Sequence, residues 1–326
     1  FGEWLMKLQI ETTCPTQWKF EYESSDPQLD DLYERAKTDQ WNVSVDIDWS
    51  KGIREDQDVF KRAETPITKT KFFGSLSKQT QKDLLANQAA FMLSQFLHGE
   101  QGALLCCGQL VDSVPSVEGK LYAATQVMDE ARHVEVFHRY LGLLDRSYPV
   151  LNGLKNVLDA ILAAETWQAK CVGMQIMVES LAMGTFRNMM VQADDPILQN
   201  IVRLTAQDEA RHVAFGILSL SEEIPKMPEE DRVALEDFAL AAIGILRGGG
   251  DGRGVNVAQS IIDAGIDPVE MRNAIAKERE EATGMPFETE QKSVVHEYMV
   301  PNLEKVGLIS ARIRPKYEEL GLIVAA

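Results

Sequence analysis

The sequence predicts an all-α fold built around a four-helix bundle, and three observations support this prediction. Apolar residues recur at helical spacing from about residue 79 onward, and strand-like alternation is nearly absent. The hexapeptide DEARHV also occurs twice, at 129–134 and 208–213. Because the chain has only five histidines, the repeat indicates a duplicated helical unit that carries a functional side chain.

Length and composition favour an ordinary globular protein, and we expect one all-α domain over residues 1–326. With 33 basic and 50 acidic residues, the net charge of −17 argues against nucleic acid or an anionic membrane surface as a partner. The four cysteines include no CxxC pair, so neither a disulfide scaffold nor a zinc site is indicated. No long apolar run or signal peptide is visible, which predicts a cytoplasmic protein.

The expected elements follow in order along the chain. Residues 1–77 form an N-terminal cap segment with one helix at about 27–40, residues 78–225 form the bundle, and residues 226–326 add C-terminal helices. Helical periodicity gives the further helices at these ranges: 79–111, 117–144, 153–163, 166–192, 197–224, 227–248, 255–282 and 290–322. The segment GGGDGRG at 248–254 has no GK[ST] and no preceding strand, so it is interpreted as a helix break rather than a phosphate loop.

Two Glu-x-x-His pairs form the core of a candidate site. Glu130 and His133 lie three residues apart and therefore on one helix face, and Glu209 and His212 repeat this spacing. A further glutamate stands thirty residues before each pair, within an otherwise apolar helix. The whole set repeats with an offset of 79 residues, and the two earlier glutamates are Glu100 and Glu179.

The thirty-residue spacing has a geometric meaning. Its midpoints are Pro115, in the break DSVPS, and Asp194, in the break ADDP. If each helix pair folds back at its break, each glutamate and its partner lie about 20 Å from the turn and face each other at the same depth. Docking the two hairpins then gathers four glutamates and two histidines in the bundle core.

These six residues are the ligand set of a carboxylate-bridged di-iron or di-manganese site. A single Glu-x-x-His is common on helices, and a lone buried glutamate is often paired with arginine. Four converging carboxylates would be too costly to bury without divalent cations, and carboxylate with imidazole suits iron or manganese. We therefore predict two metal ions, either Fe/Fe or Mn/Fe.

On these residues the chain resembles the ferritin-like di-iron carboxylate proteins over about residues 78–225. The form DE-x-RH is similar to that of multicomponent monooxygenase hydroxylases, ribonucleotide reductase small subunits and aminoarene N-oxygenases. The resemblance implies that Asp129 and Asp208 accept hydrogen bonds from the ligand histidines, crossing to His212 and His133, with Arg132 and Arg211 behind them. The alternative is a pair of surface ion pairs of little energetic value.

Three positions depart from these subfamilies. Phe137 stands where ribonucleotide reductase small subunits carry a radical tyrosine, and Met183 stands where the hydroxylases carry a threonine. Thr205 occupies the place of the seventh ligand of aminoarene N-oxygenases, a histidine. The chain is therefore expected to match the superfamily well and none of these three subfamilies cleanly, so no subfamily is assigned to it.

Residues one turn from the six ligands are candidates for a substrate pocket, with plain core packing as the alternative. Gly216 is the counterpart of Phe137 in the repeat, and we expect it to leave room for substrate or for the Phe137 ring. The predicted pocket residues are Phe96, Ala103, Leu104, Cys107, Phe137, Gln175, Ala182, Met183 and Gly216.

The expected function is that of a di-iron enzyme that uses O2 to hydroxylate, N-oxygenate or desaturate a small, mostly apolar substrate. Because the sequence has no cluster or loop to hold a redox cofactor of its own, a separate reductase or ferredoxin is implied. A homodimer is the usual expectation for such a bundle. The alternatives are a di-metal halogenase of the same fold, a non-catalytic or self-modifying di-metal protein, and a metal-free helical scaffold.

Overall fold

The computed structural model describes residues 9–54, 57–247, 258–283 and 294–324. Its core is a bundle of four long helical segments, α3 (Lys78–Ser113), α4 (Val117–Leu144), α7 (Glu179–Gln192) and α8 (Pro196–Glu223). In the described part of the chain there is no β-strand, and Phe60 and Ala193 form one isolated bridge. The all-α prediction is therefore confirmed.

Both predicted breaks separate antiparallel neighbours. The first lies between α3 and α4, and the second lies between α7 and α8. Each break also supplies the cap of the helix that follows it. The Ser116 hydroxyl accepts a hydrogen bond from the Gly119 N–H, and an Asp195 carboxylate oxygen accepts one from the Leu198 N–H. These caps fix where α4 and α8 begin, and so the depth of the residues that follow on each helix.

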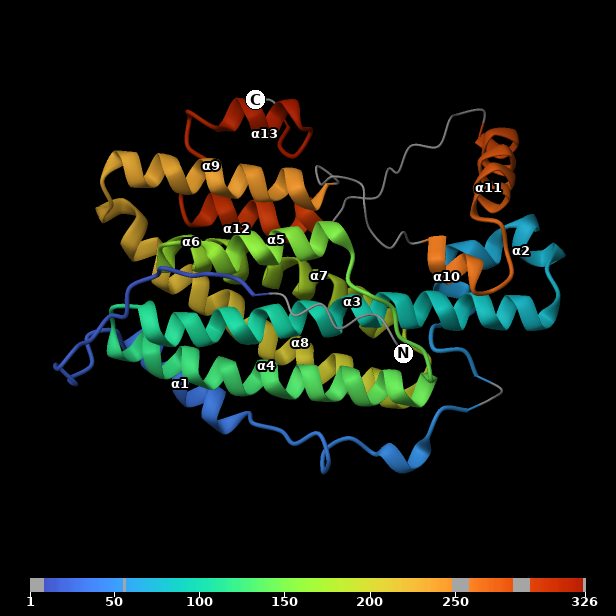
Figure 1. Cartoon of the computed structure of the whole chain (residues 1–326), viewed down its shortest axis with the longest axis horizontal. Coiled ribbons are helices and arrows are strands. Elements are labelled where there is room, and N and C mark those ends of the chain that lie inside the picture. The colour runs from blue at the N-terminus through green and yellow to red at the C-terminus, as the bar shows by residue number, and fades with distance from the viewer. Residues whose placement is uncertain (1–8, 55–56, 248–257, 284–293, 325–326) are drawn as a thin grey trace.

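The remaining helices surround this bundle (Figure 1). In the N-terminal segment, α1 (Pro27–Thr38) packs against α4 and α8, and its N-cap is Asp26. The helix α5 (Asn152–Ala163) crosses back along α3, and α9 (Glu229–Leu246) packs on α5. The N-terminal part of α3 extends beyond the bundle, where α10 (Ala258–Ile262) packs on it and α2 (Lys71–Ser75) contacts α11 (Pro268–Thr283).

The predicted helix at 166–192 is not regular. It consists of α6 (Trp167–Cys171), a π-helical segment η4 (Val172–Val178) and α7. The π-helical turns end directly before Glu179, the third glutamate of the predicted set. Such turns are rare and frequently lie at functional sites.

The C-terminal helices are shorter than predicted. Gly265, at φ 76°, and Pro268 separate α10 from α11. Gly307, at φ 83°, follows the pieces η6 (Val295–Met299) and α12 (Val300–Lys305), and α13 (Arg314–Glu319) stands apart. The left-handed backbone at these glycines ends a helix. The segment GGGDGRG lies outside the described residues, as do 255–257 and 290–293.

Candidate metal centre

Each half of the bundle contributes one lone glutamate and one Glu-x-x-His pair. Glu100 lies on α3 and Glu130 with His133 on α4, whereas Glu179 begins α7 and Glu209 with His212 lie on α8. All six side chains are buried, and the largest exposed fraction is 5%, at Glu100. The structure thus brings together at one depth all six residues that the sequence analysis singled out.

The side-chain atoms of these residues form two overlapping groups, each of a size that could hold a metal ion. One group comprises Glu100, Glu130, His133 and Glu209, and the other comprises Glu130, Glu179 and His212. In each group one donor atom per residue lies within 4.8 Å of all the others. Glu130 belongs to both groups, which is the position of a carboxylate that could bridge two ions.

The aspartates of the two DEARHV copies cross between the helices. The Nε2 atom of His133 lies 3.1 Å from Oδ2 of Asp208, and Nε2 of His212 lies 3.3 Å from Oδ2 of Asp129. A carboxylate at Nε2 favours the tautomer with its proton there, which leaves the Nδ1 lone pair free. The Nδ1 atoms face the glutamates, at 3.3 Å from Glu100 for His133 and 3.1 Å from Glu130 for His212.

Two arginines neutralise these aspartates. Arg132 lies 2.5 Å from Asp129 and 3.2 Å from Asp208, and Arg211 contacts Asp208 directly and lies 3.6 Å from Asp129. All four side chains are at most 7% exposed. They form a buried network of two anions and two cations rather than the pair of surface ion pairs that was the alternative.

The N-terminal segment completes this network with residues that the sequence analysis did not assign to it. The Trp41 indole N–H donates to Oδ2 of Asp208 at 2.7 Å, and the Gln40 amide donates to Oδ1 of Asp129 at 3.1 Å. Asp39 lies 3.3 Å from Arg211. No local signal points to these contacts, because they join residues 89 to 172 positions apart.

A second unassigned residue is Gln126, which is fully buried one turn before Glu130. Its amide nitrogen lies 3.1 Å from Glu130, 3.0 Å from the Gln175 amide oxygen and 3.3 Å from Glu179. Gln126 therefore connects carboxylates from both halves of the centre. Its position four residues before Glu130, on the same helix face, is a signal that sequence reasoning could have used.

Burial raises the pKa of three of the four glutamates. Burial raises the pKa of Glu100 to about 7, although the nearby His133 opposes the rise. Burial also raises the pKa of Glu179 and of Glu209 well above the usual value, and neighbouring glutamates add to the rise. A carboxylate cluster of this kind holds protons until positive charge neutralises it.

Glu130 behaves in the opposite way. Burial acts to raise its pKa, but His212 and His133 outweigh this effect and lower the pKa of Glu130 to about 2. The same attraction raises the pKa of both histidines, against the opposing effect of their burial. Glu130 is thus the carboxylate most strongly held in its charged form.

The predicted pocket residues lie at two opposite ends of the centre. Because α3 and α8 run antiparallel to α4 and α7, Phe96, Phe137, Ala182 and Met183 fall on the side of the break at 193–195. There Phe96 stacks on Phe186 at 4.5 Å between ring centroids, and Phe137 lies 5.9 Å from Phe186. The other predicted pocket residues fall at the opposite end, and they are Ala103, Leu104, Cys107, Gln175 and Gly216.

Gly216 does not leave room for a substrate or for Phe137. A Cβ atom there would lie 2.5 Å from the Cβ of Gln175 and 3.1 Å from Ile176, so the π-helical segment fills this space. Gly216 therefore permits the close approach of α8 to η4. Phe137 lies at the other end of the centre, so the two repeat positions do not face each other.

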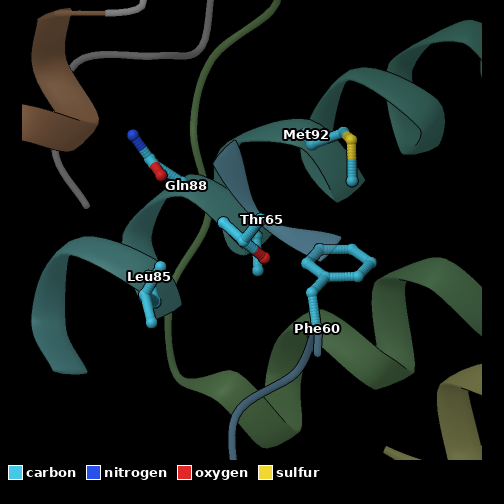
Figure 2. Close-up of a pocket in the computed structure, with 6 residues that line it drawn as sticks. Phe60, Thr65, Leu85, Gln88 and Met92 are labelled. Carbon is cyan, nitrogen blue, oxygen red and sulfur yellow. The ribbon is translucent and has the colours of Figure 1, made fainter. Parts of the chain in front are cut away.

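Two surface hollows lie elsewhere. One, of about 130 Å³, lies where α3 meets the N-terminal segment; Figure 2 shows Phe60, Thr65, Leu85, Gln88 and Met92 around it. The other, of about 430 Å³, lies between the segment at 16–22 and the start of α4. Neither hollow is lined by any of the nine predicted pocket residues, so the substrate pocket stays a prediction.

In the part of the chain that the structure describes, no helix has both the length and the apolar character to cross a membrane.

The chain has similarity to solved R2-like ligand-binding oxidases. Two variants with a Mn/Fe cofactor show TM-scores of 0.45 and 0.46 at 18% and 19% sequence identity, covering 79% and 81% of this chain and 91% and 95% of theirs. A variant with an Fe/Fe cofactor shows a TM-score of 0.42 at 19% identity, with coverage of 78% and 91%. No curated protein matches the chain.

A family model described as p-aminobenzoate N-oxygenase AurF matches residues 23–285, well over half of the chain. This match confirms the resemblance to the aminoarene N-oxygenases and supplies the subfamily that the sequence analysis did not assign, although Thr205 departs from the pattern expected there. The Thr205 side chain is fully buried one turn before Glu209, and its hydroxyl has no hydrogen-bond partner among the described residues. The chain belongs to the p-aminobenzoate N-oxygenase AurF family.

Proposed function

We propose that the chain binds two metal ions, Fe/Fe or Mn/Fe, and uses O2 to oxidise a small, mostly apolar organic substrate. Among hydroxylation, desaturation and N-oxygenation, we favour N-oxygenation of an arylamine, because the family is named for this reaction on p-aminobenzoate. The observation that carries the proposal is the pair of overlapping buried groups that share Glu130.

The buried polar atoms of the chain fit such a centre. Both carboxylate oxygens of Glu209, Oε2 of Glu130 and Nδ1 of His212 are buried without a hydrogen-bond partner among the described residues. Each unpartnered buried atom of this kind costs about 1–3 kcal/mol. Coordination of two cations, one by each group, would give these atoms partners. Oxygen and imidazole donors of this set suit iron or manganese.

The six residues Glu100, Glu130, His133, Glu179, Glu209 and His212 would hold the ions, which when bound supply the electrons and the Lewis acidity that activate O2. The aspartates would hold the histidine Nε2 protons, and the arginines would keep those aspartates charged. Gln126 would orient Glu130 and Glu179 by donating to both. Burial of all these groups would exclude bulk water.

The stoichiometry defines what else the reaction requires. One oxygen atom of O2 would be inserted into an N–H bond of the amine, and the other would be reduced to water with two electrons and two protons. A separate reductase or ferredoxin would supply these electrons. The stacked rings of Phe96, Phe137 and Phe186 would provide an apolar wall on one side of the centre.

The first experiment measures metal content after anaerobic loading with Fe²⁺. Wild type should hold about two ions per chain, and His212→Ala should hold fewer because it removes one imidazole donor. His138→Ala is the matched control, since His138 lies exposed on α4 and should leave the metal content unchanged. Less than about half an ion per wild-type chain would contradict the metal centre.

The second experiment tests the reaction. Metal-loaded protein receives p-aminobenzoate or another arylamine, a chemical reductant and ¹⁸O2, and mass spectrometry follows the product. We expect one labelled oxygen atom on the nitrogen. Consumption of O2 with no labelled arylamine would contradict the substrate class but not the metal centre, and bound metal without O2 consumption would contradict the oxygenase function.

A further inference from the structure

The hollow shown in Figure 2, which we call the α3 hollow, lies on the same side of the metal centre as the three stacked phenylalanine rings. It has a volume of about 130 Å³ and is lined by Phe60, Thr65, Leu85, Gln88, Ala89 and Met92. One face of α3 carries Leu85, Ala89 and Met92, and the same face continues through Phe96 to Glu100. The α3 hollow therefore lies in line with the first glutamate of the centre, and Met92 precedes Glu100 by about 12 Å along the helix.

One apolar cluster joins the α3 hollow to the centre. Met92 and Phe60 of the hollow pack in the same cluster as the three stacked rings. Phe96 is half-buried, whereas Phe137 and Phe186 are fully buried. The Phe96 ring lies 5.8 Å from Phe137 and 4.5 Å from Phe186, between ring centroids. Phe96 is therefore the ring that separates the hollow from the buried end of the centre.

The α3 hollow offers nothing to hold an anion. None of its six lining residues is charged. The two neighbouring basic side chains have other partners, since Lys61 donates to the Val191 carbonyl at 2.8 Å and Arg62 lies 2.5 Å from Asp58. A carboxylate that entered here would lose its hydration without gaining a cation, whereas an arylamine is uncharged at neutral pH. The hollow therefore favours uncharged molecules over carboxylates.

A single hydroxyl lies at the inner end of this apolar side. Thr205 is fully buried on α8 one turn before Glu209, and its hydroxyl has no hydrogen-bond partner among the described residues. By contrast, the Thr185 hydroxyl on α7 donates to the Leu181 carbonyl at 2.7 Å, as helical threonines commonly do. The Thr205 hydroxyl is thus free to bond a ligand that carries one small polar group. The other residues one turn from the metal ligands on this side are apolar, and they are Phe96, Leu97, Val136, Phe137, Ala182 and Met183.

We propose that the α3 hollow is the outer opening of the substrate route, that Phe96 closes this route toward the centre, and that the route admits uncharged arylamines in preference to aminobenzoates. A cavity of roughly 150 Å³ holds one benzene ring, so the hollow admits one ring at a time. The ring would pass along the apolar side of α3, and its amino group would meet the Thr205 hydroxyl. This proposal rests on the proposed function, because it assigns an entrance and a substrate class to the same centre.

The first test compares two ligands on protein loaded with Zn²⁺, which does not activate O2. Fluorine NMR measures the binding of 4-fluoroaniline, and competition measures the binding of p-aminobenzoate. The dissociation constant of 4-fluoroaniline should be lower on the order of 10-fold or more, because the carboxylate must give up its hydration. Tighter binding of p-aminobenzoate would overturn this inference and leave the proposed function standing. Binding of neither ligand would contradict both the inference and the arylamine class.

The second test concerns the opening and uses the same NMR signal to measure rates. Gln88 is half-buried in the α3 hollow, and Gln88→Trp should fill it. Association and dissociation of 4-fluoroaniline should both slow on the order of 10-fold, with the dissociation constant changed less than about 2-fold, because the bound ligand lies beyond the hollow. Gln79→Trp is the matched control, since Gln79 is exposed on the same helix outside the hollow. Unchanged rates for Gln88→Trp, or a matching loss of affinity, would overturn the proposal.

A third variant tests the ring that closes the route. Phe96→Ala should speed association and dissociation of 4-fluoroaniline on the order of 10-fold, because it removes the ring between the hollow and the centre. Phe91→Ala is the matched control, since Phe91 packs on Tyr148 at 5.6 Å and does not line the hollow. The melting temperatures of both variants show that the fold is retained. Wild-type rates in Phe96→Ala would mean that the ligand reaches the centre by another route.

Discussion

The two halves of the bundle carry the same ligand pattern in different surroundings. The hairpin of α3 and α4 is regular α-helix throughout, and its outer face is exposed. The hairpin of α7 and α8 is entered through the π-helical segment η4, and η6 packs on α7 and α12 on α8. The thirty-residue spacing and its break therefore set the depth of the ligand residues in both hairpins, whatever packs on the outside.

The halves also differ in what supports their aspartates. Asp208 accepts from the Trp41 indole at 2.7 Å, whereas Asp129 accepts from the Gln40 amide at 3.1 Å. The surroundings lower the pKa of Asp208, because hydrogen bonding to His133 and the charges of His133 and Arg211 outweigh its burial. Asp208, the acceptor for His133, therefore receives a shorter hydrogen bond from the N-terminal segment than Asp129, the acceptor for His212.

The largest expected effect is a loss of metal affinity when either aspartate is replaced, and variants of its partners test the difference between the two. Asp208→Asn and Asp129→Asn should each weaken metal binding about 10–100-fold, because the histidine Nε2 loses its charged acceptor. Trp41→Phe should weaken it less than Asp208→Asn, since the aspartate remains. Anaerobic titration with Mn²⁺ measures all three. Trp49→Phe is the control, because the Trp49 indole donates to the Val43 carbonyl instead; equal effects of the two tryptophan variants would refute a specific role for Trp41.

A smaller effect tests the π-helical entry of the second hairpin. Gly216→Ala should lower the free energy of unfolding by about 1–3 kcal/mol, because the new methyl group would meet Gln175 at 2.5 Å. In the first hairpin, Gly142→Ala should be neutral or stabilise by up to ~1 kcal/mol, since open space surrounds Gly142 on α4. Urea denaturation compares the two. A Gly216→Ala variant as stable as wild type would mean that η4 moves aside freely.

Sequence reasoning predicted the features that depend on local spacing. The helix ends at both breaks follow from positions along the helices, and so does the depth of Glu100 opposite Glu130 and of Glu179 opposite Glu209. The crossing of Asp129 to His212 came instead from the resemblance to the ferritin-like di-iron proteins. The arrangement that results is the one described above. The division of the chain into cap, bundle and C-terminal helices rests on the same periodicity and stays a prediction.

The features that sequence reasoning missed depend on packing between residues far apart in the chain. Trp41 and Gln40 reach the centre across the bundle, and no periodic pattern marks them. The π-helical turns have the same apolar composition as an α-helix, and the filled space at Gly216 depends on which residue of η4 packs against it. A sequence repeat shows which residues correspond, but in an antiparallel arrangement corresponding residues lie at opposite ends, as Phe137 and Gly216 do.

The smallest expected effect concerns Lys170, on α6 at the entry to the second hairpin. Its buried ammonium donates to the Gln109 side chain of α3 at 2.7 Å and to the Leu162 carbonyl at 2.8 Å, both uncharged. Burial lowers the pKa of Lys170 below 10.5, so the folded chain releases this proton before the unfolded chain does. Between the lowered pKa and 10.5 the unfolded state binds more protons, and stability therefore rises with pH.

Thermal unfolding of wild type and Lys170→Met from pH 7 to pH 10 measures this effect. The melting temperature of wild type relative to the variant should rise over this range, because only wild type loses a buried charge. Lys37→Met serves as the exposed control, since the hydrogen bond to Glu34 raises the pKa of Lys37 and the corresponding difference should not rise. A flat difference for Lys170→Met would mean that Gln109 and Leu162 stabilise the ammonium as well as water does. The contact between α6 and α3 would then accommodate the buried Lys170 charge without a charged partner.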